Sequence, residues 1–173
     1  MPLATGHRYL IALGSNVRHS RHGEPERVLA AALERLEAEG MDIVAAAPII
    51  ASDPIGPSIR RYANSAAIVA TRLAPSELLA LLKRVEREFG RRAGGQRWRA
   101  RVLDLDVVLW SGGPYVDRSL TIPHPLFRER DFVLGPASAI APHWRDPVTG
   151  ATVRQLGFRL ARRSPVDPAL PRT

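Results

Sequence analysis

The sequence contains no cysteine. This absence excludes disulfide bonds, zinc sites built on thiolates and a cysteine nucleophile. Any metal ion must therefore be held by oxygen or histidine ligands. Long apolar runs are missing as well: the longest mostly apolar stretch, residues 43–51, contains Pro48 and is far shorter than a membrane span. Residues 1–8 are short and mixed and do not read as a secretory signal, so a soluble, cytoplasmic protein is expected.

Several common motifs of nucleotide-binding proteins and hydrolases are absent too. The sequence has no GxxxxGKS/T phosphate loop, no GxGxxG after an expected strand, no HExxH zinc motif and no GxSxG nucleophile elbow. If the chain handles nucleotides, it does so outside the commonest architectures for that purpose.

Lysine is almost missing, since Lys83 is the only one, and arginine carries nearly all the positive charge behind the net charge of +8. Such a charge can indicate a nucleic-acid partner. However, the arginines are spread along the chain and aromatic residues make up only 6% of it, with no glycine-aromatic RNA-binding signature. Arginine is concentrated only in residues 84–101, where a local anionic ligand explains it as well as a polynucleotide does. A basic RNA-binding module is kept as the alternative to an enzyme.

The length of 173 residues and the hydrophobic fraction of 45% suit one ordinary globular unit. We expect a single domain over residues 1–162. Residues 163–173 form a proline-rich tail, with Pro165, Pro168 and Pro171, that is expected to be disordered.

Strands and helices follow one another along this expected domain. Alternating or β-branched apolar patterns predict strands over residues 8–13, 41–50 with an interruption near Pro48, 62–72, 102–110 as the central strand, and 115–117 as a short edge strand. Helical spacing of apolar residues predicts helices over residues 24–39, 75–90 and 129–140, and a last helical turn over 153–158. This order predicts an α+β fold, a ferredoxin-like α/β sandwich with helices packed on a mainly antiparallel sheet.

Two aspartates, Asp104 and Asp106, lie two positions apart in an otherwise apolar run. In a strand both side chains point to the same face, where two like charges are costly unless a cation sits between them or one is protonated. Magnesium prefers such oxygen ligands and keeps open positions for phosphates, and arginines upstream supply the planar fork that matches phosphate oxygens. The alternative is an acidic strand face preceded by a solvated basic loop.

Six short motifs together resemble the 6-hydroxymethyl-7,8-dihydropterin pyrophosphokinase family over residues 9–156. They are Ile-Ala-Leu-Gly-Ser-Asn at 11–16, Asp-Pro-Ile-Gly-Pro at 53–57, Tyr-Ala-Asn at 62–64, the segment from Arg-Trp at 97 to Asp106, Leu-Thr-Ile-Pro-His-Pro at 120–125 and Arg-Asp-Phe-Val-Leu at 130–134. Each motif alone is modest, but in this order and spacing they are highly specific.

The resemblance implies transfer of pyrophosphate from ATP to the pterin hydroxymethyl group with release of AMP, in folate biosynthesis. It implies two magnesium ions held by Asp104 and Asp106, and no nucleic-acid or membrane partner; a monomer is expected. The implied catalytic residues are Asp104, Asp106, Arg91 and Arg101. The implied ATP-binding residues are Glu86, Arg97, Trp98, Arg101, Val107, Thr121, His124 and Arg130. The implied pterin-binding residues are Ser52, Pro54, Gly56, Tyr62, Asn64 and Phe132.

Overall fold

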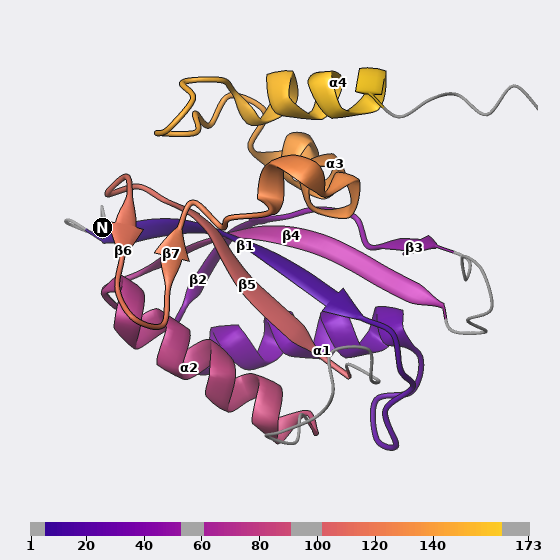
Figure 1. The fold of residues 1–173 in the computed structure, drawn as a ribbon. Coiled ribbons are helices and arrows are strands. Elements are labelled where there is room, and N and C mark those ends of the chain that lie inside the picture. The colour runs from indigo at the N-terminus through magenta and orange to yellow at the C-terminus, as the bar shows by residue number, and fades with distance from the viewer. Residues whose placement is uncertain (1–5, 53–60, 91–101, 164–173) are drawn as a thin grey trace, which may run out of the picture.

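A five-stranded sheet lies between two layers of helices in the computed structural model, which describes residues 6–52, 61–90 and 102–163 (Figure 1). Its strands are β1 (His7–Ser15), β2 (Asp42–Ala46), β3 (Ile50–Ser52), β4 (Tyr62–Thr71) and β5 (Asp104–Trp110). The strand order is β2-β4-β1-β5, β3 also pairs with β4, and every pair is antiparallel. The predicted sandwich with a mainly antiparallel sheet is confirmed.

Two helices cover each face of the sheet. Helices α1 (Pro25–Ala38) and α2 (Pro75–Glu88) lie on one face, and α3 (Asp131–Ile140) and α4 (Val153–Arg163) are stacked over the other (Figure 1). A short hairpin of β6 (Tyr115–Val116) and β7 (Thr121–Ile122) leads to the 3-10 helix η1 (Phe127–Glu129), which precedes α3. Helix α3 packs mainly against β4 and α4, so the second helical layer covers only part of its face.

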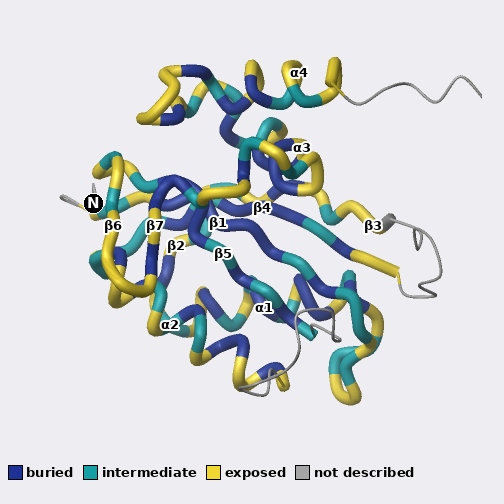
Figure 2. Tube along the Cα trace, in the orientation of Figure 1, coloured by how far each residue is buried: buried dark blue, intermediate teal, exposed yellow. Residues whose placement is uncertain are grey.

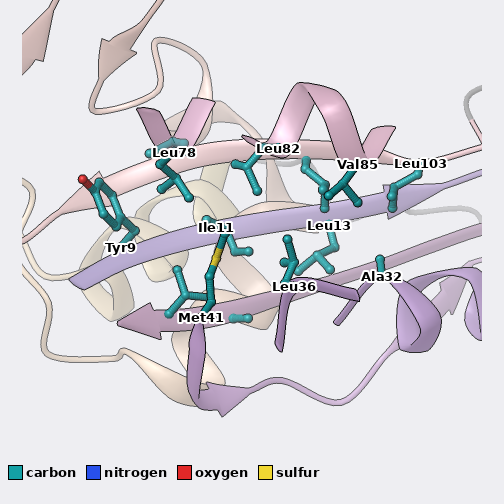
Figure 3. Close-up of a cluster of buried hydrophobic side chains, with 14 of the residues drawn as sticks. Tyr9, Ile11, Leu13, Ala32, Leu36, Met41, Leu78, Leu82, Val85 and Leu103 are labelled. Atoms are coloured by element: carbon teal, nitrogen blue, oxygen red, sulfur yellow. The ribbon is translucent and has the colours of Figure 1, made fainter. Parts of the chain in front are cut away.

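The core consists of two clusters, one on each side of the sheet. On β1 the side chains of Tyr9, Ile11 and Leu13 point to α1 and α2, where Leu36 and Leu82 meet them (Figure 3). The alternate residues of β1 belong to the second cluster, under α3 and α4. Because both faces are covered, β1 reads as a nearly continuous apolar run and is buried along most of its length (Figure 2).

Helices α1 and α2 begin and end at residues that favour helix termini. Each begins with a proline, Pro25 or Pro75, in the first turn, where the missing amide hydrogen costs nothing. Each is followed within two residues by a glycine with positive φ, Gly40 at 87° and Gly90 at 103°. The predictions of both helices are confirmed.

Three expectations about the elements need correction. The strand with the two aspartates, predicted to be central, lies at one end of the described sheet, where β5 pairs with β1. Helix α4 extends from Val153 to Arg163, so it is longer than the predicted turn and includes the first residue of the expected tail. The rest of that tail lies outside the described residues. In the parts of the chain that are described, no helix is long and apolar enough to cross a membrane.

Candidate active site

The two aspartates of β5 point to the face of the sheet on which α3 lies. Their neighbours Leu105 and Val107 are buried in the cluster beneath α1 and α2. Because strand side chains alternate, Asp104 and Asp106 take the opposite face, where both are only partly buried. The common face expected from their spacing is therefore present.

Strand pairing places Asp104 in one row with Asn64. Asp104 lies opposite Gly14, Gly14 opposite Asn64, and Asn64 opposite Ile50. Directly opposed residues of antiparallel strands point to the same face, so these side chains share one surface. Two strand spacings separate Asn64 from Asp104, which is about 10 Å between their backbones. A Cβ at Gly14 would lie 3.4 Å from Oδ1 of Asn64, so the amide group extends over the glycine between them.

The side chains of His124 and Arg130 approach Asp106 from the segment that joins β7 to α3. Nε2 of His124 and a guanidinium nitrogen of Arg130 each lie 3.9 Å from the same oxygen, Oδ2. The backbone amide of His124 donates to the carbonyl oxygen of Val108, 3.0 Å away on β5. Nδ1 of His124 accepts a hydrogen bond from the amide of Leu126 at 3.2 Å, which leaves Nε2 as the donor that faces Asp106.

The surroundings of Asp106 disfavour its charged form and raise its pKa. Burial raises the pKa of Asp106, and the charge of Asp104 raises it further, while His124, Lys83 and Arg130 act in the opposite direction. Burial also lowers the pKa of His124, with Arg130 and Lys83 adding to that effect and the two aspartates opposing it. A divalent cation between the carboxylates would remove the repulsion.

The donor set suits magnesium held jointly with substrate phosphates. Within the described ranges, no group of three or more histidine, cysteine, aspartate or glutamate side chains could hold a metal ion. Magnesium usually takes only one or two carboxylates from the protein and completes its octahedron with phosphates and water. Asp104 and Asp106 are two carboxylates on one face of β5, which is the number that such a site takes from the protein.

Glu86 reaches the edge of β5 from α2, on the other side of the sheet. Its carboxylate is completely buried and accepts a 2.8 Å hydrogen bond from the amide of Leu105, between the two aspartates. The ammonium group of Lys83 lies 3.2 Å from its second oxygen. Sequence reasoning assigned no site role to Lys83, although its being the only lysine was a usable signal.

Exposed apolar side chains lie on the same face of the sheet as Asn64 and on α3, which packs against β4. Tyr62, two residues before it on the same face of β4, is 38% exposed, and Phe132 on α3 is 47% exposed. The guanidinium carbon of Arg130 lies 5.6 Å from the centroid of the Phe132 ring. Ile50, the cross-strand neighbour of Asn64, is 51% exposed and was not predicted as a site residue. Large apolar groups around one amide suit a flat heterocycle with polar edges.

The remaining predicted residues are placed as follows. Ser52 pairs with Tyr62, Thr121 lies exposed in β7, and the side chain of Val107 is buried in the core away from the aspartates. Six predicted residues lie outside the described residues: Pro54, Gly56, Arg91, Arg97, Trp98 and Arg101.

Comparison with known proteins gives a consistent result. Residues 10–142 match the family described as 7,8-dihydro-6-hydroxymethylpterin-pyrophosphokinase (HPPK). A Pseudomonas aeruginosa protein named 2-amino-4-hydroxy-6-hydroxymethyldihydropteridine pyrophosphokinase is 39% identical over 81% of this chain and 84% of its own length. A Synechocystis protein of the same name is 40% identical over 61% of this chain, and the match spans 53% of that protein.

The fold also matches a solved structure. The wild-type HPPK-DHPS of Plasmodium falciparum superimposes with a TM-score of 0.70 over 92% of this chain, at 13% sequence identity. The chain spans 42% of that longer protein. At this identity the likeness supports the fold.

Proposed function

The chain belongs to the 7,8-dihydro-6-hydroxymethylpterin-pyrophosphokinase family, and we propose that it transfers the pyrophosphoryl group of ATP to the hydroxymethyl oxygen of 6-hydroxymethyl-7,8-dihydropterin, with release of AMP, in folate biosynthesis. The observation that carries this proposal is the row of Asn64, Gly14 and Asp104 across three adjacent strands. The amide of Asn64 can form hydrogen bonds with the edge of a heterocycle, and the carboxylate of Asp104 can bind metal. Their backbones lie about 10 Å apart.

The pterin binds over Gly14 in this proposal. The amide of Asn64 offers both an acceptor and donors to the polar edge of the ring. Tyr62 and Phe132, both partly exposed, contact the ring faces, and Ser52, Pro54 and Gly56 line the same pocket. The ring then extends over β1, and its hydroxymethyl group points toward Asp104 and Asp106.

ATP binds on the side of the aspartates. Asp104 and Asp106 hold two magnesium ions together with the phosphates, and their partly buried carboxylates on one face fit that role. When bound, the ions neutralise phosphate charge and lower the pKa of the attacking hydroxyl. Arg130 and Nε2 of His124, each 3.9 Å from Asp106, lie where they can donate to phosphate oxygens.

Alignment of the two substrates accounts for most of the rate enhancement in this proposal. Pyrophosphoryl transfer needs the hydroxyl oxygen and the β-phosphorus in line, and little covalent help from the protein. Arg91, Arg97, Trp98 and Arg101 complete the phosphate side of the site in this proposal. Val107 and Thr121 contact the nucleotide, and for Val107 the contact is through its backbone because its side chain is buried.

We further propose that residues 1–162 act as one catalytic domain, as a monomer in the cytoplasm, with the two small-molecule substrates as its partners. Size-exclusion chromatography with light scattering tests the monomer. The alternative of a basic RNA-binding module gains no support from the relatives described above, which are named as pyrophosphokinases. The paired aspartates would also repel RNA phosphates when no metal is bound.

The decisive test is AMP formation, measured by chromatography. We expect AMP from ATP only when magnesium and 6-hydroxymethyl-7,8-dihydropterin are both present, and none when either is omitted. Folded protein that forms no AMP with all three components would refute the proposed function.

A further inference from the structure

The strand that presents the two carboxylates lies at an edge of the described sheet, and edge strands lack a second neighbour to hold them. Metal binding needs Asp104 and Asp106 at a fixed spacing. Among the described residues, hydrogen bonds on the outer side of β5 include one from the amide of His124 to the Val108 carbonyl and one from the amide of Leu105 to Glu86.

The bond to Glu86 acts at the peptide between the carboxylates. In an antiparallel ladder, successive residues bond alternately to one neighbour and to the other. Because the amide of Leu105 is directed at Glu86, it faces away from β1. The backbone N–H and C=O groups of the flanking residues, Asp104 and Asp106, are therefore directed at β1, where Gly14 and Ala12 lie opposite them. Among the described residues, this stretch of β5 is therefore held by β1 on one side and by the carboxylate of Glu86 on the other.

A buried carboxylate is a costly way to attach a helix to a sheet. Glu86 is completely buried, whereas Leu82 and Val85 on the same helix already pack α2 against the sheet. A buried carboxylate is costly to desolvate unless it is well paired, and an apolar residue of similar volume often stabilises a fold equally well. The partners of Glu86 include the amide of Leu105 at 2.8 Å and the ammonium group of Lys83 at 3.2 Å.

We propose that Glu86 is a positioning residue for magnesium binding: through the amide of Leu105 it fixes the part of β5 that presents Asp104 and Asp106. Lys83 balances its charge. The inference rests on the proposed function, because it takes the two aspartates as metal ligands. It also gives Glu86 a role that does not depend on contact with the nucleotide.

The test compares Glu86→Leu, which has no acceptor for Leu105, with Glu86→Gln, which keeps a carbonyl oxygen. Glu88→Gln is the matched control, because Glu88 ends the same helix but pairs at the surface with Arg35 at 2.9 Å. Hydrogen exchange of the Leu105 amide, followed by NMR in metal-free protein, reports the hydrogen bond. Thermal shifts with a non-hydrolysable ATP analogue, titrated with magnesium, report metal binding without turnover.

For Glu86→Leu we expect the hydrogen-exchange rate of the Leu105 amide to rise about tenfold or more. The magnesium concentration at half-saturation should rise by about the same factor. Pterin affinity should stay within about twofold, because Asn64 lies two strands away. Glu86→Gln should restore both readouts to within about threefold of wild type, and Glu88→Gln should change neither. If Glu86→Leu does not fold, Glu86→Asp replaces it, since the shorter side chain withdraws the acceptor but keeps the charge for Lys83.

Wild-type magnesium binding in a variant whose Leu105 amide exchanges faster would overturn the proposal, because Glu86 would then be purely structural. Unchanged exchange at Leu105 would overturn it as well. Failure of the proposed function is distinguishable from both, since the wild-type protein itself would then show no magnesium-dependent shift with the ATP analogue.

Discussion

Asp146 and Arg128 join the segment that carries His124 and Arg130 to the loop before α4. Asp146 is completely buried, and its two oxygens accept hydrogen bonds from Nε and Nη2 of Arg128 at 2.7 and 2.8 Å. Thr149 adds a third bond at 2.6 Å and the amide of Val148 a fourth at 3.0 Å. Burial alone would raise the pKa of Asp146, but these bonds outweigh it and lower the pKa to about 2.

The free energy of unfolding should therefore fall in acid. The pKa of Asp146 is about 2 in the folded protein and 3.8 as the reference value, so its contribution is complete above pH 3.8 and is lost as the pH falls toward 2. The whole contribution corresponds to about 2 kcal/mol, of which about 1 kcal/mol should already be lost at pH 3.

The variant Asp146→Asn separates this effect from general acid sensitivity. At pH 7 it should lower the free energy of unfolding by about 2–4 kcal/mol, because Arg128 loses its charged partner in a partly buried position. Urea unfolding of both proteins should show this difference shrink by about 1 kcal/mol at pH 3, where the carboxyl group is protonated in the unfolded wild-type chain but still mostly ionised in the folded protein. Asp42→Asn, at the exposed start of β2, is the control and should change stability little at either pH. A difference that is the same at both pH values would refute the reasoning.

Three further predictions concern the site and its support. Asp104→Asn and Asp106→Asn should each lower turnover by a factor on the order of 1,000 in the AMP assay while the melting temperature stays the same or rises; near-full activity of either would exclude the metal assignment. Asn64→Ala should raise KM for the pterin by about tenfold, through loss of about 1.5 kcal/mol of hydrogen bonding, and leave KM for ATP unchanged. Gly112→Ala should lower the free energy of unfolding by about 1–3 kcal/mol in urea, because its Cβ would lie 2.4 Å from the Trp110 ring, and steady-state KM values should not move.

Local patterns in the sequence were sufficient for much of the fold. The first helix is bounded by Pro25 and Gly40, and its apolar residues recur at helical spacing, so both its ends and its buried side are predictable. The common face of Asp104 and Asp106 follows in the same way from the two-residue period of a strand. These features depend on neighbours within a few positions of the chain.

Features that depend on distant pairing could not be predicted. An apolar run such as β5 is typical of a central strand, but here its apolar residues face clusters on both sides of the sheet while the strand lies at the sheet's edge. The row from Asn64 to Asp104 depends on the register of three strands, which long-range packing decides. Helix α4 continues beyond the predicted end at Phe158, and Leu160 in that extension packs on the second cluster, a contact that depends on the tertiary fold.

The partial covering of the sheet by α3 and α4 leaves apolar side chains exposed at the proposed pterin site. On that face Ile50 and Tyr62 remain more than one third exposed, where a complete sandwich would bury them. A pterin bound at the proposed site would cover these two side chains, so its binding would bury apolar surface that the ligand-free protein exposes to water. At a ligand concentration 100 times Kd, binding adds about 2.7 kcal/mol to the free energy of unfolding. Ligand at the proposed pterin site would thus slow proteolysis of the folded protein through the same linkage.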